Sequence, residues 1–147
     1  MFESADAAAW TIAEGHTGEY PFQARFRRMP AGFPRADYPQ RLDIFWTMRQ
    51  PDDEGMASRN ELAALHVFED RLIPAVEQDE SAWLVAVLTG RSEREFVFQV
   101  VDPELFLRRL GEMPQEADPY PVEITLTDDP DWAYYEAILP DDGSPLQ

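Results

Sequence analysis

One uninterrupted run of apolar residues, Trp83–Leu88, constrains the fold of this chain more than any other feature. A strand with one face in water alternates apolar and polar residues, whereas an unbroken apolar run is typical of a strand covered on both faces. The run is followed by a turn at residues 90–93 and by an alternating segment at residues 95–101. Together they predict a hairpin whose first strand needs cover on each side.

Four further strands are predicted, three of them because apolar residues recur at every second position. They cover residues 10–14, 21–27, 41–49 and 122–127. In the third of these segments, Phe45 lies on the opposite side from the main apolar row, beside Asp43 and Thr47.

A long helix is predicted to begin after Ser58. Ser58 and Glu61 have the spacing of a capping box, in which the serine hydroxyl accepts from the Glu61 amide and the Glu61 carboxylate reaches back to the cap. Apolar residues then recur at spacings of three and four, as on an amphipathic helix. Pro74 falls inside this stripe, so a kink or an early end is expected near Ile73.

Two shorter helices are predicted where an aspartate is followed by proline and then by an acid, at residues 102–104 and 129–131. Aspartate is a good helix cap, proline suits the first helical position, and an acid there faces the positive end of the helix dipole. Gly111 and Pro140 are expected to end the two helices.

The resulting element order is ββ-αββαβ-α, which predicts an α+β protein with a mainly antiparallel sheet. We expect a ferredoxin-like split βαβ core (βαββαβ) with an added N-terminal β-hairpin and a short C-terminal helix. In that fold the Trp83–Leu88 strand lies at a sheet edge, so the N-terminal hairpin or a second subunit has to cover it. Residues 1–147 are expected to form a single domain, with residues 1–8 and 141–147 as loose termini.

The charge of the chain is large and unevenly placed. The formal net charge is −17, and the first fifty residues balance six acids against six arginines, so residues 51–147 carry all of it. Such a surface repels nucleic acid and anionic lipid, because binding to both depends on basic side chains. It attracts basic protein surfaces. We therefore expect no nucleic-acid or membrane partner, and either a basic protein partner or self-association.

Few residues that perform chemistry are present. There is no cysteine, the two histidines are His16 and His66, and no phosphate-binding glycine loop or nucleophile elbow occurs. We expect no catalytic residue, no cofactor and no metal site. The N-terminus has acids where a signal peptide needs basic residues, and no apolar run has the length of a membrane span, so a cytoplasmic protein is expected.

Two groups of residues are candidates for binding. Arg94, in the alternating strand, can meet Glu69 or Asp70 of the long helix across the helix–sheet boundary. Such a set either fixes the helix on the sheet or forms a carboxylate and arginine site. The second group is a sheet face that carries Phe45, Val97 and Val101 among polar residues, which we expect to be exposed.

Three segments together resemble the bacterial "domain of unknown function 695" family: NELAALHVFEDRL, TGRSEREFVFQVVDPE and TDDPDWAYYEAILP. Gln99 stands where the resemblance leads us to expect an aromatic residue. The family implies no established activity, and the joining of some of its relatives to a domain similar to regulators of ribonuclease E indicates a regulatory binding role. The positions carried over from the family are Glu69, Asp70, Arg94, Glu95, Phe96, Trp132 and Tyr135.

These observations lead to one hypothesis and two alternatives. The hypothesis is a non-catalytic acidic interaction module that binds a basic protein partner, of a regulatory, nuclease-inhibitor or immunity type. The first alternative is an enzyme or small-ligand binder with a carboxylate and arginine site. The second is a structural subunit of a homo-oligomer.

Overall fold

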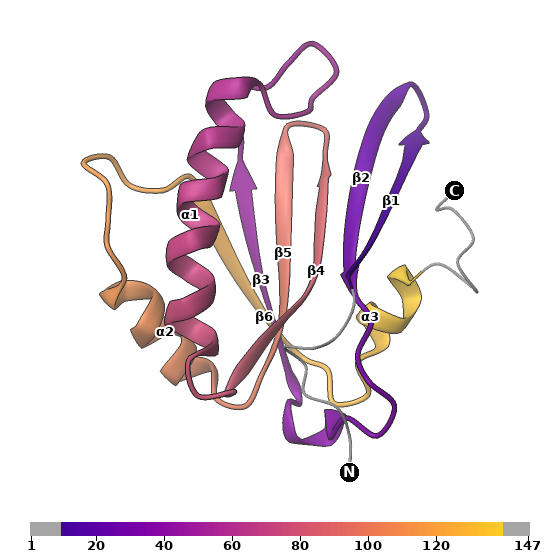
Figure 1. Ribbon diagram of the computed structural model, residues 1–147, viewed down its shortest axis with the longest axis vertical. Helices are drawn as coiled ribbons and strands as arrows, with labels where there is room; N and C mark the ends of the chain where they lie inside the picture. Colours follow the sequence, from indigo (N-terminus) through magenta and orange to yellow (C-terminus); the bar gives the residue numbers. More distant parts are fainter. Residues whose placement is uncertain (1–9, 140–147) are drawn as a thin grey trace.

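The computed structural model describes residues 10–139, so the expected loose termini, residues 1–8 and 141–147, lie outside the described part. Six strands form one open sheet, with helices on its two faces (Figure 1). This confirms an α+β protein with a mostly antiparallel sheet. The strands are β1 Trp10–Thr17, β2 Tyr20–Arg27, β3 Gln40–Thr47, β4 Ala82–Gly90, β5 Glu93–Val100 and β6 Val122–Asp128. The helices are α1 Arg59–Glu77, α2 Pro103–Glu112 and α3 Ala133–Ile138, with a short 3-10 turn at Arg35–Asp37.

The strands lie in the order β1-β2-β4-β5-β3-β6, and every neighbouring pair is antiparallel. The N-terminal hairpin extends the sheet, because β2 pairs with β4 from Phe22 opposite Gly90 to Phe26 opposite Ala86. The exposed edge expected for the Trp83–Leu88 strand is therefore covered by this hairpin within the same chain.

A β-bulge explains how the apolar run in β4 is buried on both faces. The register with β5 shifts between Leu84 and Ala86, so Val85 is an extra residue on the bulged strand. Leu84 and Val87 join the core beneath α1 and α2, whereas Trp83 and Val85 join a second core on the other face. The prediction of a strand covered on both sides is confirmed.

The two cores have different covers. On one face, α1 and α2 bury Leu65, Phe68 and Phe106 against the sheet. On the other face, α3 and the connection between β2 and β3 bury Trp132 and Phe33. We call the first the helix face and the second the α3 face.

Two expected helix ends differ from the structure. Helix α1 does not end near Ile73 but continues through Pro74 to Glu77. Pro74 and Asp70 are both exposed, so water can solvate the carbonyl that loses its helical partner. Helix α2 likewise continues past Gly111, which places Met113 in the core beneath α1 and α2.

In the part of the chain that the structure describes, no helix combines the length and the apolar character needed to cross a membrane.

Candidate functional site

The predicted contact between α1 and β5 is present, on the helix face of the sheet. A guanidinium nitrogen of Arg94 lies 3.5 Å from a carboxylate oxygen of Glu69, and the Arg94 Nε donates to Thr89 Oγ1 at 2.9 Å. Arg25 of β2 donates to the other Glu69 oxygen. Glu69 and Arg94 are each only 7% exposed, whereas Asp70 is exposed and takes no part. This arrangement fixes α1 on the sheet.

Trp132 and Tyr135 lie on the opposite face and hold the short helix α3. The Trp132 indole N–H donates to the carbonyls of Arg35 and Tyr38, each at 3.1 Å. The Tyr135 hydroxyl donates to the Arg27 carbonyl at 2.6 Å and accepts from the Met29 amide at 3.1 Å. Both side chains are buried. They lie in the core on the α3 face, whereas Glu69 and Arg94 meet on the helix face, so the structure does not bring the six residues of the predicted cluster together.

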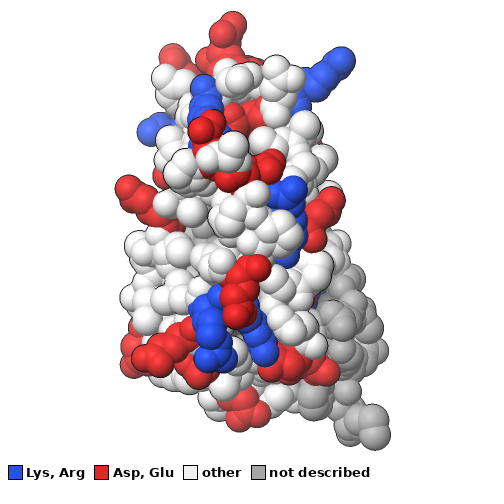
Figure 2. Space-filling view, turned by 90° about the vertical axis from the view of Figure 1, so that its left-hand side faces the viewer, with Lys and Arg blue, Asp and Glu red and all other residues white. Residues whose placement is uncertain are grey.

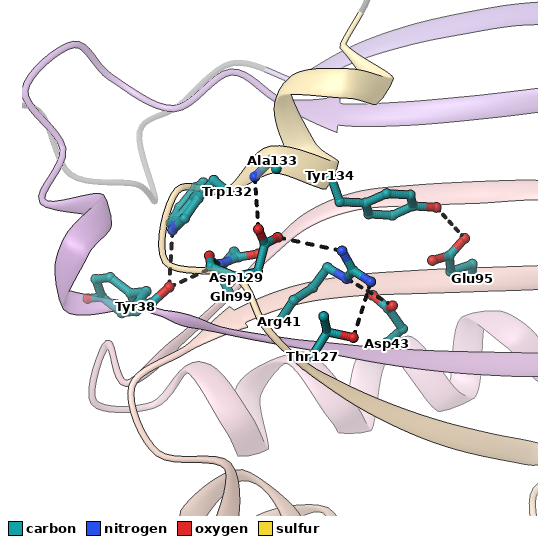
Figure 3. A network of polar contacts seen from close by, with 10 residues as sticks. All are labelled: Tyr38, Arg41, Asp43, Glu95, Gln99, Thr127, Asp129, Trp132, Ala133 and Tyr134. Atoms are coloured by element: carbon teal, nitrogen blue, oxygen red, sulfur yellow. Dashed lines mark hydrogen bonds and ion pairs between the residues drawn. The ribbon is translucent and has the colours of Figure 1, made fainter.

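A polar network extends from α3 across the α3 face, with Arg41 of β3 at its centre (Figure 3). Arg41 Nε donates to Asp43 Oδ2 at 3.1 Å, and Arg41 Nη1 lies 3.6 Å from Asp129 Oδ2. Arg41 also donates to Thr127 Oγ1 at 3.3 Å, and its guanidinium lies 4.4 Å from the centre of the Tyr134 ring. One cation therefore holds two aspartates and stacks on an aromatic ring.

The same network begins α3 and explains the buried glutamine. Asp129 Oδ1 accepts from the Ala133 amide at 2.9 Å. The helix start predicted at residues 129–131 is nevertheless wrong, because α3 begins at Ala133 with Trp132 at the N-cap position. Gln99, fully buried in β5, donates from its amide to the Tyr38 carbonyl at 3.0 Å. This hydrogen bond gives the amide of a fully buried side chain an acceptor.

Glu95 lies at the outer end of this network, where the Tyr134 hydroxyl donates to Glu95 Oε1 at 2.9 Å. Burial raises the pKa of Glu95 to about 7, although the Tyr134 hydrogen bond opposes the shift. Burial also raises the pKa of Tyr134, followed in effect by the Glu95 charge, so the phenol keeps its proton at neutral pH. Glu95 can thus gain or lose a proton near pH 7.

The wild-type protein is expected to lose stability as the pH rises, and Glu95→Gln is expected to abolish this loss. The folded protein holds the Glu95 proton up to about pH 7, whereas the unfolded chain releases it near pH 4–5, so raising the pH between these values weakens the folded state. The variant should match the wild type near pH 5 and unfold at higher urea than the wild type near pH 8. Urea titrations at both pH values measure this difference. The exposed neighbour Glu93→Gln is the control, and an equal gain in both variants contradicts the prediction.

Beyond α3, the α3 face stays open to solvent. Across four neighbouring strands, Leu88 lies opposite Glu95, Glu95 opposite Phe45, and Phe45 opposite Glu123. An open pocket of about 270 Å³ adjoins this row, between β2 and the turn that joins β4 to β5. The set of side chains that we call the open sheet face consists of Phe22, Phe45, Leu88, Glu93, Glu95 and Glu123.

The exposed face predicted from Phe45, Val97 and Val101 is wrong in part. Val97 is 0% exposed, because the connection after β2 and α3 cover this part of the sheet. Val101 is exposed but lies just beyond the end of β5. Phe45 is half-buried and does belong to the open sheet face.

Several residues of the site were not predicted. Arg25 and Arg41 each alternate with apolar residues along their own strands, and this alternation was the available signal that they lie on the other face from the apolar row. Tyr134 and Leu88 carried no comparable signal, because their importance depends on which strands and helices lie side by side.

The fold and the site define a small α+β protein whose acidic and apolar side chains share one open face of an antiparallel sheet. The chain belongs to a family of unknown function, DUF695, whose sequence model matches residues 9–139. No curated protein and no solved structure matches the chain.

Proposed function

We propose that this protein is an acidic interaction module that binds a basic protein partner through the open sheet face. The observation that carries the proposal is the alternation of apolar and carboxylate side chains across β4, β5, β3 and β6, from Leu88 through Glu95 and Phe45 to Glu123. Half-buried apolar residues offer contact area, and the carboxylates between them suit lysine and arginine side chains.

The distribution of charge supports this choice of surface. On the side of the molecule that carries α2, carboxylates lie next to guanidiniums (Figure 2). Asp79 is paired there with Arg109 at 2.6 Å, and Glu116 with Arg71 at 3.3 Å. In such pairs the positive and negative charges neutralise each other. Glu93 and Glu123, in contrast, are exposed beside apolar residues on the open sheet face.

A regulator, nuclease inhibitor or immunity protein fits this description. The substrate-binding surface of a nuclease is basic because it neutralises phosphates. A protein of net charge −17 is drawn toward such a surface from a distance, and a partly apolar face then gives the complex its specificity.

The test is affinity capture from cell lysate at about 0.05 M and about 0.5 M salt, followed by cross-linking and mass spectrometry. A double variant, Glu93→Gln with Glu123→Gln, removes two charges from the open sheet face. A matched variant, Asp70→Asn with Glu112→Gln, removes two charges from exposed positions on α1 and α2.

We expect one basic protein that binds the wild type and the matched variant at low salt and is lost from the face variant. Its cross-links should fall on β3, β5 or β6. Equal loss from both variants, or cross-links confined to α1 and α2, contradicts the proposal. Sedimentation of the same samples detects the alternative in which the open sheet face contacts a second copy of this chain.

We also infer that the part of the chain from β3 to β6 has the ferredoxin-like arrangement. The order β4-β5-β3-β6 and the position of α1 and α2 on one face support it. The hairpin β1–β2 is then an addition at the β4 edge.

A further inference from the structure

The pocket beside Glu95 has a shape that depends on one glycine. It is lined by Phe22, Leu88, Thr89, Gly90, Arg91, Glu93 and Glu95. Gly90 lies directly opposite Phe22, and a Cβ atom at Gly90 would come within 3.0 Å of the Phe22 Cβ and within 3.3 Å of the Pro21 carbonyl oxygen. Glycine therefore lets β2 and β4 approach closely at the point where the pocket forms.

The lining has an apolar part and a carboxylate part. Phe22 and Leu88 are half-buried and provide an aromatic ring and an aliphatic surface. Glu93 and Glu95 are two residues apart on β5, so both project to the same side of the sheet. The volume of about 270 Å³ is below the usual range of small-molecule sites and suits one side chain better than a larger ligand.

Arg91, which also lines the pocket, is directed toward the neighbouring hairpin. The guanidinium carbon of Arg91 lies 5.1 Å from the centre of the Tyr20 ring, on the hairpin formed by β1 and β2. The Arg91 charge is thus held over an aromatic ring at the rim of the pocket.

We infer that this pocket receives the side chain of a single arginine of the basic partner proposed above. The planar guanidinium can stack on the Phe22 ring while its N–H groups donate to the carboxylates of Glu93 and Glu95. The inference rests on the proposed function and adds to it the one partner residue that the open sheet face recognises.

The surroundings of Glu95 give this recognition a pH dependence. Glu95 faces Tyr134 from α3, Asp43 and Arg41 from β3, and Glu93 on its own strand, with Leu88 opposite on β4. Burial holds part of Glu95 in the protonated form at neutral pH. A bound guanidinium favours the ionised form, so binding releases a proton and tightens as the pH rises through about 7.

The test uses N-acetyl-arginine amide as the probe and follows backbone amide shifts of the full chain by NMR. N-acetyl-citrulline amide has nearly the same shape without the charge, and N-acetyl-lysine amide has the charge without the planar group. We expect saturable shifts at Gly90, Glu93 and Glu95 with the arginine probe, weaker shifts with the lysine probe, and none with citrulline.

Glu95→Gln should weaken binding of the arginine probe about tenfold at pH 8 and much less at pH 6. Glu93→Gln, an exposed position that does not threaten folding, should weaken it at both pH values, and Glu112→Gln on α2 should leave it unchanged. Shifts that are absent, equal for all three probes, or equally strong with lysine overturn the inference. They do not overturn the proposed function, which is decided by whether the wild-type chain captures a basic protein and by where the cross-links to that protein fall.

Discussion

Replacing Glu61 with alanine is expected to lower the free energy of unfolding by about 3 kcal/mol or more. Glu61 lies in the first turn of α1 and is only 4% exposed. Its Oε2 accepts from the Trp46 indole at 2.7 Å, and its Oε1 accepts from the amides of Arg49 and Gln50 at 2.8 and 2.7 Å. Alanine leaves three N–H groups without this acceptor, and each such loss is costly when the donor is buried.

Urea unfolding followed by tryptophan fluorescence measures this effect. Glu61→Gln should cost about 1–2 kcal/mol, because an amide keeps one acceptor oxygen but loses the charge. Asp70→Asn, an exposed acid on the same helix, is the control and should stay within about 0.5 kcal/mol of the wild type. A Glu61→Ala protein as stable as this control contradicts the assigned role.

Replacing Trp132 with alanine is expected to cost about 3–5 kcal/mol. The side chain is fully buried, packs 5.5 Å from the Tyr135 ring and 5.8 Å from the Phe33 ring, and donates to two carbonyls of the connection before β3. Alanine leaves a cavity and removes the link between α3 and that connection. Trp132 also has a positive φ of 57°, which strains the backbone of any residue other than glycine, and alanine does not relieve this strain.

The matched control for Trp132→Ala is Glu136→Ala on the same helix. Glu136 forms an exposed ion pair with Arg35 at 2.7 Å, which should contribute less than about 1 kcal/mol. Hydrogen exchange should show faster exchange at α3 and at the Tyr38 region in the Trp132 variant. Similar costs for the two variants indicate that α3 is not held by Trp132.

Loss of α3 is also expected to affect the site. Tyr134 and Asp129, which hold Glu95 and Arg41, belong to α3 and to the segment that begins it. A Trp132→Ala protein that remains folded should therefore lose the pH dependence assigned to Glu95, because a displaced α3 no longer shields Glu95 from water and the burial that raises its pKa is lost.

Ser58 and Glu61 form one hydrogen bond that their spacing in the sequence predicts and others that it does not. The Ser58 hydroxyl accepts from the Glu61 amide at 3.2 Å, as the capping box predicts. The Glu61 carboxylate does not reach back to its own helix but binds Trp46 and the chain after β3. The cap depends on residues three positions apart, whereas the carboxylate finds its partners only when β3 and α1 pack together.

The sequence by itself determined the element order, the helix starts at Ser58 and Asp102, and the need to cover Trp83–Leu88 on both faces. These properties follow from backbone periodicity and from side chains that lie close along the chain. Only the tertiary structure decided that Val97 is buried while Phe45 stays accessible, and that Glu95 meets Tyr134, which lies 39 positions away. A strand pattern shows which residues share a face, but the packing of other elements decides which part of that face remains open.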